Sequence, residues 1–301
     1  MTETEPRNIK TIGIFAPSSS FPEDRYQNGL SKLKNLGFGI VEPEGLRKKQ
    51  GYLAGDDSHR VRLLHSMLEN EEIDCIWAAR GGYGLHRIID KIDIQKLKAS
   101  NKLIVGFSDI CALHALVQKE TNGLSIHGPV VTQLSNFDSP QLRQVEEVVR
   151  NEWSQLTYES SKPSIVRGKC DGILVGGCLS VITPLLGTPY MPPLDDSILL
   201  LEDVGETVYR IDRLLQHLRL AGVFKRVRGI ALGEFYNCEP RNDNEPNLQS
   251  IFEDILGDVS VPVLNGLPFG HGHINQAIPL GARAFIETND STGKLVVNRD
   301  G

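Results

Sequence analysis

Short apolar runs that alternate with helical stretches constrain the fold of this chain most. Residues 11–16, 73–79 and 102–107 have the length and composition of buried β-strands. Residues 25–36 and 110–117 carry helical patterns and follow two of these runs. Strands and helices that alternate in this way build a mostly parallel sheet with helices on both faces. The sequence therefore predicts an α/β fold for the first half.

The region 136–163 interrupts this pattern, and we expect the domain boundary there. Turn-forming residues gather at both of its ends, in Asn136-Phe137-Asp138-Ser139-Pro140 and in Ser160-Ser161-Lys162-Pro163. A chain of 301 residues is long enough for about two domains of ~100–200 residues each. The predicted organisation is an N-terminal domain over 1–135, a linker over 136–163 and a C-terminal domain over 164–301.

The second half mixes strand and helix signals. Apolar runs over 197–201, 227–235 and 261–268 predict strands, and the turn-rich stretch 289–293 predicts a hairpin near the end of the chain. Over 207–224, apolar residues recur at helical spacing, and a glycine stands where a C-cap is expected. This half is therefore not a second copy of the first.

The composition excludes several classes of protein. The chain has 32 basic and 38 acidic residues, a net charge of −6, whereas nucleic-acid binding calls for a basic patch. No apolar run reaches the ~18 residues of a membrane span, and residues 1–10 lack the features of a signal peptide. Five scattered cysteines without a Cys-x-x-Cys motif argue against disulfides and structural zinc. We expect a cytoplasmic protein that binds neither nucleic acid nor membranes.

Ser108 follows the third apolar run in the motif Gly106-Phe107-Ser108-Asp109. A tight turn from a strand into a helix presents a serine as a nucleophile and offers main-chain N–H groups to an oxyanion. The motif only approximates Gly-x-Ser-x-Gly, and serine is also a favoured helix N-cap. This segment by itself therefore leaves two roles open for Ser108, nucleophile and cap.

A glycine-rich loop, Arg80-Gly81-Gly82-Tyr83-Gly84, follows the second apolar run. It has neither the lysine of a P-loop nor the spacing of a dinucleotide fingerprint. It is either a plain turn or a loop whose main chain approaches a ligand closely. Ligands gather outside the carboxyl ends of strands in parallel sheets, so this loop could supply an oxyanion N–H beside Ser108.

A serine nucleophile needs a base, usually histidine, and a carboxylate that orients it. His271 and His273 lie in a glycine-rich loop after a strand, and an exposed, flexible loop favours a catalytic histidine; the alternative is a His-x-His metal site. Glu202 follows an all-apolar strand, and it is either the orienting carboxylate or the start of a solvated loop.

We expect His127 to be structural. Cys111, the alternative nucleophile, has the position of a buried small hydrophobe.

Together these segments resemble the LD-carboxypeptidases, a family of serine peptidases that includes muramoyltetrapeptide carboxypeptidases and microcin-C immunity peptidases. The likeness extends from Ile14 to Gly281. Five motifs in this order are specific, although each by itself is weak. They are Arg80-Gly81-Gly82-Tyr83-Gly84, Gly106-Phe107-Ser108-Asp109, His127-Gly128-Pro129, Leu201-Glu202-Asp203 and Gly266-Leu267-Pro268-Phe269-Gly270-His271.

The resemblance implies a triad of Ser108 as nucleophile, His271 as base and Glu202 as its partner, with main-chain oxyanion donors at Asp109 and Gly82. It implies neither metal nor cofactor. The family fold joins the α/β domain to a smaller, β-rich α+β domain, assembles the triad across the domain interface and makes a homodimer plausible. The implied substrate is a murein tetrapeptide, which loses its terminal D-alanine during peptidoglycan recycling.

Two alternatives stay open at this stage. An immunity-type peptidase would keep the triad and cleave peptidyl- or aminoacyl-nucleotide antibiotics. A non-catalytic module would use the same scaffold only to hold peptides. A substrate with a free terminal carboxylate also calls for a cation, and the candidates are Arg80, Arg210 and Arg213.

Overall fold

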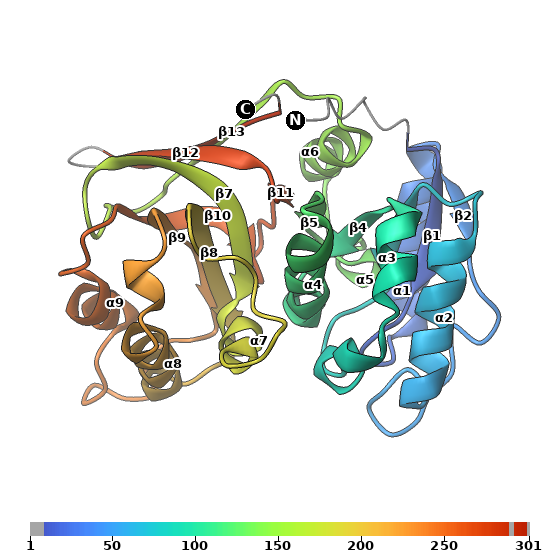
Figure 1. Cartoon of the computed structure of the whole chain (residues 1–301), viewed down its shortest axis with the longest axis horizontal. Coiled ribbons are helices and arrows are strands. Elements are labelled where there is room, and N and C mark those ends of the chain that lie inside the picture. Colours follow the sequence, from blue (N-terminus) through green and yellow to red (C-terminus); the bar gives the residue numbers. More distant parts are fainter. Residues whose placement is uncertain (1–8, 289–291, 300–301) are drawn as a thin grey trace. The chain divides into compact units, whose positions relative to one another are not determined.

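The computed structural model describes residues 9–288 and 292–299, and the chain folds into two compact units (Figure 1). The N-terminal unit comprises Met1–Trp153 together with Gln276–Pro279. The C-terminal unit comprises Ser154–Asn275 and Leu280–Gly301. The described residues include no helix that is long and apolar enough to cross a bilayer.

The described part of the N-terminal unit contains a six-stranded sheet, in which β2, β1, β3, β4 and β5 pair in parallel. In order across the sheet, the strands are β11 (Ile278–Leu280), β5 (Ser125–His127), β4 (Leu103–Gly106), β3 (Cys75–Ala78), β1 (Thr11–Phe15) and β2 (Gly39–Val41). The α-helices are α1 (Glu23–Asn35), α2 (Asp57–Glu69), α3 (Ile94–Ser100), α4 (Cys111–Thr121), α5 (Val131–Leu134) and α6 (Ser139–Arg150). Single 3-10 turns are η1 (Leu85–Arg87), η2 (Ile89–Lys91) and η3 (Ser108–Ile110).

The three apolar runs of the first half form β1, β3 and β4, the adjacent strands at the middle of this sheet. All four residues of β3 and of β4 are buried, because helices cover a parallel sheet on both faces. Helix α2 packs on α3 and α3 on α4, while α1 packs on α5. The predicted mostly parallel α/β fold is confirmed.

The described part of the C-terminal unit contains a seven-stranded mixed sheet. In order across the sheet, the strands are β10 (Val263–Gly270), β9 (Gly229–Tyr236), β8 (Ser197–Val204), β7 (Lys169–Cys178), β12 (Arg283–Thr288), β13 (Gly293–Asn298) and β6 (Gln155–Glu159). Strands β7 to β10 pair in parallel, and β12, β13 and β6 extend the sheet antiparallel. The β-rich α+β class is confirmed.

Helices α8 (Val208–Leu220) and α9 (Leu248–Leu256) pack their apolar sides into the core of this unit. The predicted stripe of α8 is fully buried there and consists of Val208, Ile211, Leu215 and Leu218. The helix ends before Gly222, whose φ of +76° is left-handed, and the short turn η5 (Val223–Lys225) follows. The remaining short elements are α7 (Leu179–Ile182) and η4 (Thr183–Leu185).

The structure differs from the prediction over 136–163, where we expected a linker. This segment contains α6 and β6, and the chain passes from one unit to the other between Trp153 and Ser154. A capping box between Asp138 and Gln141 starts the helix, so the turn-like residues at its start are a helix cap. Strand β6 is amphipathic, which the largely polar sequence concealed.

The hairpin predicted around residues 289–293 is formed by β12 and β13, which pair from Thr288 and Gly293 onward. Residues 289–291 of its turn, like residues 1–8 of the predicted polar N-terminus, lie outside the described residues.

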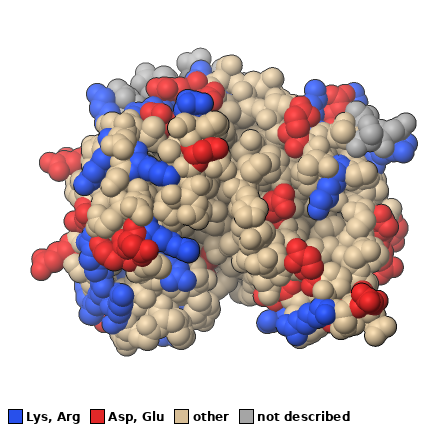
Figure 2. Space-filling view, turned by 180° about the vertical axis from the view of Figure 1, so that it is seen from behind, with Lys and Arg blue, Asp and Glu red and all other residues tan. Residues whose placement is uncertain are grey.

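Basic and acidic side chains lie intermixed on the face drawn in Figure 2. Elsewhere in the described residues, exposed ion pairs include Arg226 with Asp195 at 2.8 Å and Arg228 with Asp196 at 2.6 Å. Exposed pairs of this kind contribute about 0–1 kcal/mol each to stability, so the fold depends on its two cores rather than on them.

Candidate active site

Three loops meet where β1, β3 and β4 end in the N-terminal unit. Parallel neighbouring strands end at one edge of a sheet, so the segments that follow them lie together. The Ser19 N–H donates to the carbonyl of Gly81 at 3.2 Å, which joins the first loop to the second. A Cβ at Gly81 would lie 2.9 Å from the Cβ of Ser108, which places the second loop against the third.

Ser108 stands in the left-handed region of backbone conformation, with a φ of +64°. This conformation strains a residue that has a Cβ, and it typifies the sharp turn that presents a nucleophile after a strand. The cap position of η3 is Phe107 and that of α4 is Ile110, so the structure does not use Ser108 as a helix cap.

The backbone before this turn is held by two hydrogen bonds to the carbonyl of Gly106. One comes from the N–H of Gly128 at 3.1 Å, and the other is made by Nε2 of His114 at 2.8 Å. Burial lowers the pKa of His114 to about 3, so its imidazole is neutral and Nε2 donates. His114 therefore supports the turn rather than the chemistry.

The strain at Ser108 predicts a stability difference between two variants. We expect the free energy of unfolding of Ser108→Gly to be about 1 kcal/mol higher than that of Ser108→Ala, because glycine adopts a positive φ without a steric penalty. Urea titration of both variants measures the difference. At Ser66 in α2, the order should be reversed: the free energy of unfolding of Ser66→Gly should be about 1 kcal/mol lower than that of Ser66→Ala. Equal stabilities at position 108 would contradict a strained turn.

The glycine-rich loop approaches its neighbours too closely for side chains. A Cβ at Gly81 would also lie 3.1 Å from Oγ of Ser108, and one at Gly82 would lie 2.4 Å from Oγ of Ser19. Gly82 in addition has a φ of +101°. Of the two roles that the sequence left open for this loop, the close approach to Ser108 favours a binding loop. Nη1 of Arg80 donates to the carbonyl of Ser20 at 2.6 Å.

The C-terminal unit brings His271 and Glu202 together. Nδ1 of His271 donates to Oε2 of Glu202 at 2.6 Å, and the carboxylate is completely buried. Glu202 lies in β8, while His271 directly follows β10. A Cβ at Gly270, whose φ is +110°, would lie 2.6 Å from Oε2 of Glu202. Glu202 is therefore a buried partner of the histidine and not the start of a solvated loop.

A second buried carboxylate, Asp203, lies beside this pair. It accepts hydrogen bonds from the N–H and Oγ of Ser180 at 2.8 and 3.0 Å. Burial, with the adjacent charge of Glu202, raises the pKa of Asp203 to about 6. Burial lowers the pKa of His271, but the charges of Glu202 and Asp203 and the hydrogen bond outweigh it, so this pKa is raised. A raised pKa makes the imidazole of His271 more basic than that of an ordinary histidine.

The other predicted residues have local roles in the structure. His273 packs its ring edge-on against Tyr236, and the buried His127 packs against Phe107. Cys111 is completely buried at the start of α4, as expected of a small hydrophobe.

Two of the three arginine candidates lie on α8. Arg210 forms an ion pair with Glu206 at 3.1 Å. The guanidinium of Arg213 lies 5.9 Å from the ring centroid of Tyr209. Only Arg80 belongs to a loop that contacts the Ser108 turn.

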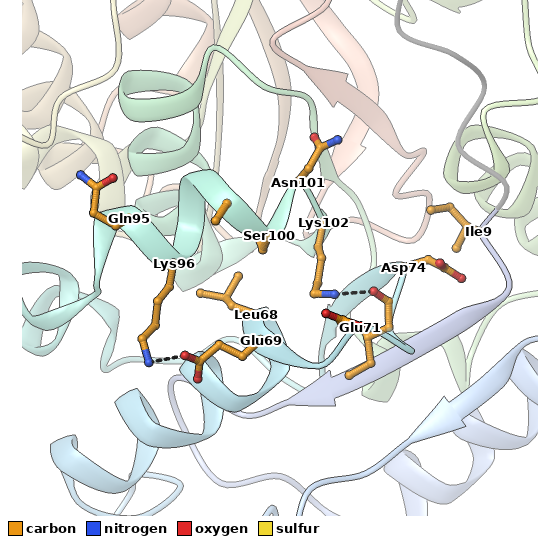
Figure 3. A pocket seen from close by; sticks show the side chains of 12 residues that line it. Ile9, Leu68, Glu69, Glu71, Asp74, Gln95, Lys96, Ser100, Asn101 and Lys102 are labelled. Atoms are coloured by element: carbon orange, nitrogen blue, oxygen red, sulfur yellow. Dashed lines mark hydrogen bonds and ion pairs between the residues drawn. The ribbon is translucent and has the colours of Figure 1, made fainter.

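Among the described residues, no three His, Cys, Asp or Glu side chains are grouped as metal ligands. A cavity of about 770 Å³ lies at the amino ends of β3 and β4, the edge opposite Ser108 (Figure 3). Lys96 there pairs with Glu69 at 2.6 Å, and Lys102 donates to the carbonyls of Asn70 and Ile73. Both lysines are engaged in these contacts, and the cavity lies at the edge of the sheet away from Ser108.

The residues that join the loops around Ser108 were not predicted from the sequence. They include Ser18 and Ser19 after β1, and the fully buried Arg60 on α2. Ser18 and Ser19 could have been predicted to lie near Ser108, since β1 was predicted in the same parallel sheet as the strand before Ser108. No pattern in the sequence indicates that Arg60 is buried beside these loops.

Models of the two domains of one protein family match the chain. The LD-carboxypeptidase N-terminal domain matches residues 12–128, and the LD-carboxypeptidase C-terminal domain matches residues 171–286. These two matches together cover most of the chain and include Ser108, Glu202 and His271.

Individual relatives extend over nearly the full length. A probable murein peptide carboxypeptidase of Bacillus subtilis is 33% identical over 290 residues, covering 95% of this chain and 91% of that protein. The microcin C7 self-immunity protein MccF of Escherichia coli is 26% identical over 314 residues, covering 92% and 90%. The crystal structure of muramoyltetrapeptide carboxypeptidase from Oxalobacter formigenes matches with a TM-score of 0.86 and 26% identity, over 96% of this chain and 99% of that one.

Proposed function

Because the chain belongs to the LD-carboxypeptidase family, we propose that it hydrolyses the amide bond to the terminal D-alanine of murein tetrapeptides, in peptidoglycan recycling. The hydrogen bond between His271 and the buried Glu202 carries this proposal, since it is the base half of a serine-hydrolase triad. The strained turn at Ser108 supports the nucleophile half. The names of the relatives support the substrate.

In the proposed reaction, Oγ of Ser108 attacks the carbonyl carbon of the scissile amide while Nε2 of His271 takes its proton. Glu202 holds Nδ1–H, which fixes the tautomer and stabilises the imidazolium. The main-chain N–H groups of Asp109 and Gly82 donate to the oxyanion. His271 then gives its proton to the leaving amine, and D-alanine departs. Water, deprotonated by His271, attacks the acyl-enzyme and releases the tripeptide.

We propose Arg80 as the cation that binds the terminal carboxylate of the substrate. Its loop contacts the Ser108 turn, and its hydrogen bond to the carbonyl of Ser20 holds the guanidinium beside the same loops. Arg210 and Arg213 lie on α8, where Arg210 pairs with Glu206 just before the helix and Arg213 lies over the ring of Tyr209.

Mass spectrometry of purified protein with murein tri-, tetra- and pentapeptides tests the function. We expect the tetrapeptide to lose one alanine, and the tripeptide and pentapeptide to stay intact. Loss of D-alanine from the pentapeptide, or an intact tetrapeptide, would contradict the proposal.

The second candidate is an immunity-type peptidase, which the 26% identity to the MccF protein favours. Such an enzyme would use the same triad and would cleave an aminoacyl-sulfamoyl adenylate. Comparing kcat/KM for that compound and for the tetrapeptide separates the two candidates, with the tetrapeptide expected to be the better substrate. A non-catalytic module would bind the tetrapeptide and leave both compounds uncleaved.

The raised pKa of His271 predicts the pH dependence of the reaction. Only the neutral imidazole accepts a proton, so the acid limb of kcat/KM should lie above the ordinary histidine value of 6.5. Glu202→Gln removes the charge that favours the imidazolium, so it should move this limb to lower pH. It should also lower kcat by about 10⁴-fold, the loss seen when the triad carboxylate becomes an amide.

A pH–rate profile of both enzymes measures this shift. Glu253→Gln on α9 removes the same charge from the same unit and should leave the limb in place. An upward shift in Glu202→Gln would contradict the proposed pairing.

A further inference from the structure

Two charged side chains, Asp109 and Arg60, are buried in the N-terminal unit and have no part in the reaction described above. Each is 1% exposed. Isolated charges are costly to bury unless they are paired and hydrogen-bonded, so their contacts indicate what they stabilise.

The Asp109 carboxylate joins all three loops at the carboxyl edge of the sheet. Its Oδ2 accepts a hydrogen bond from Oγ of Ser18 at 2.5 Å and another from the N–H of Leu85 at 2.8 Å. Ser18 follows β1, Leu85 directly follows the glycine-rich loop, and Asp109 itself follows Ser108. One oxygen atom thus links the loop on each side to the nucleophile turn.

Arg60 joins two of the same loops from α2. Its Nη1 donates to the carbonyl of Pro17 and, at 2.8 Å, to the carbonyl of Gly84. Its Nη2 pairs with Asp57 at 2.5 Å. The glycine-rich loop is therefore held at its end by both buried charges, while its middle is held by Ser19, whose Oγ accepts the N–H of Tyr83 at 3.2 Å.

We propose that the side chain of Asp109 is a positioning residue, which holds the main chain of the glycine-rich loop beside Ser108 in the geometry that the oxyanion requires. The inference rests on the proposed nucleophile. The loop carries Gly82, a proposed oxyanion donor, and its Gly81 already contacts the Ser108 side chain. Because Asp109 and Leu85 bond directly, losing the carboxylate releases the loop at the residue after Gly84.

Such a role affects kcat more than KM. Oxyanion donors bind charge that develops only in the transition state, so displacing them raises the barrier with little change in ground-state binding. A residue that merely stabilised the fold would instead lower the folded fraction. The two roles are therefore separable by kinetics measured on folded protein.

The matched control is Asp74, at the opposite end of the same sheet. Its Oδ2 also accepts two hydrogen bonds, from the N–H groups of Lys10 and Thr11, each at 2.8 Å. Asp74→Ala therefore removes the same kind of anchor away from Ser108. It should lower the unfolding midpoint and leave kcat within about twofold of wild type.

The experiment compares Asp109→Ala, Asp109→Asn and Asp74→Ala in kcat, KM and urea midpoint. Asp109→Ala should lower kcat by about 10²–10³-fold, the loss typical of removing one oxyanion donor, with KM within about threefold. Asp109→Asn keeps an acceptor oxygen, so its kcat should be at least tenfold higher than that of Asp109→Ala. Should Asp109→Ala fail to fold, Ser18→Ala removes one of the two bonds and should lower kcat about tenfold.

Wild-type kcat in folded Asp109→Ala would overturn the inference, as would equal kcat losses in the Asp109 and Asp74 variants. The rate at which a fluorophosphonate probe labels Ser108 provides a second readout, independent of the murein substrate, and should fall in Asp109→Ala. If the probe labels Ser108 of the wild-type protein but the tetrapeptide stays intact, the proposed function is wrong and the inference about Asp109 stands. If the wild-type protein is neither labelled nor active, the proposed function and the inference are both wrong.

Discussion

Ser108→Ala is expected to lower kcat for the murein tetrapeptide by about 10⁶-fold, the size of effect found when the nucleophile of a serine hydrolase is removed. Alanine keeps the Cβ, so the strained turn with its φ of +64° is retained and only the attacking oxygen is lost. KM should change little, because Oγ contributes to bond formation rather than to binding. Single-turnover mass spectrometry of released D-alanine is sensitive enough to measure the residual rate.

Ser66→Ala is the control for this substitution, since Ser66 is an exposed serine of α2 whose Oγ donates to the carbonyl of Leu63 in the same helix. It should retain wild-type kcat. If Ser108→Ala kept more than about a hundredth of the wild-type rate, another group would have to be the nucleophile. Cys111 would then be the first residue to test, even though it is completely buried.

His271→Ala should produce a loss of similar size, about 10⁶-fold in kcat, because the base and the nucleophile act as one unit. The structure distinguishes His271 from His273. Nδ1 of His271 bonds to the buried Glu202, whereas the ring of His273 packs against Tyr236. His273→Ala should therefore stay within about threefold of wild type. Parallel kcat measurements on the two variants decide between the histidines.

The reverse order, with His273→Ala the more damaging variant, would overturn the assigned base. The double variant that combines Ser108→Ala with His271→Ala adds a further check. Since Ser108 and His271 are proposed to act together, removing both should cost little more than removing either one.

The buried apolar strands were predictable from the sequence because burial on both faces produces continuous apolar runs. This is how β1, β3, β4 and β8 were recognised. Strand β6 alternates polar and apolar residues, and β11 has only three residues, so neither has a strong local pattern. Helix α6 was hidden by Pro140, which reads as a turn but here stands in the first turn of the helix.

The candidate site was predictable to a different extent in its two halves. The strand-to-helix turn at Ser108 is a local pattern, and it led directly to the strained residue. The role of Glu202 depended on the resemblance, because a carboxylate at a strand end is ambiguous until its partner is known. Asp109 and Ser18 lie 91 positions apart in sequence, so their bond appears only in the folded chain. Homodimer formation and a cytoplasmic location stay predictions.

Strand β11 also determines when the N-terminal unit can finish folding during translation. The segment Gln276–Pro279, in which β11 begins, leaves the ribosome only after Ser154–Asn275 of the other unit. Until then the edge of β5 has no neighbour, and Gln144 lacks the backbone of Ala277, with which it exchanges hydrogen bonds of 3.0 and 2.9 Å. A nascent or truncated chain that ends before residue 276 therefore has an open sheet edge at β5, which pairs with β4, the strand that precedes Ser108. The six-stranded sheet of this unit is therefore complete only after residue 280 has been synthesised.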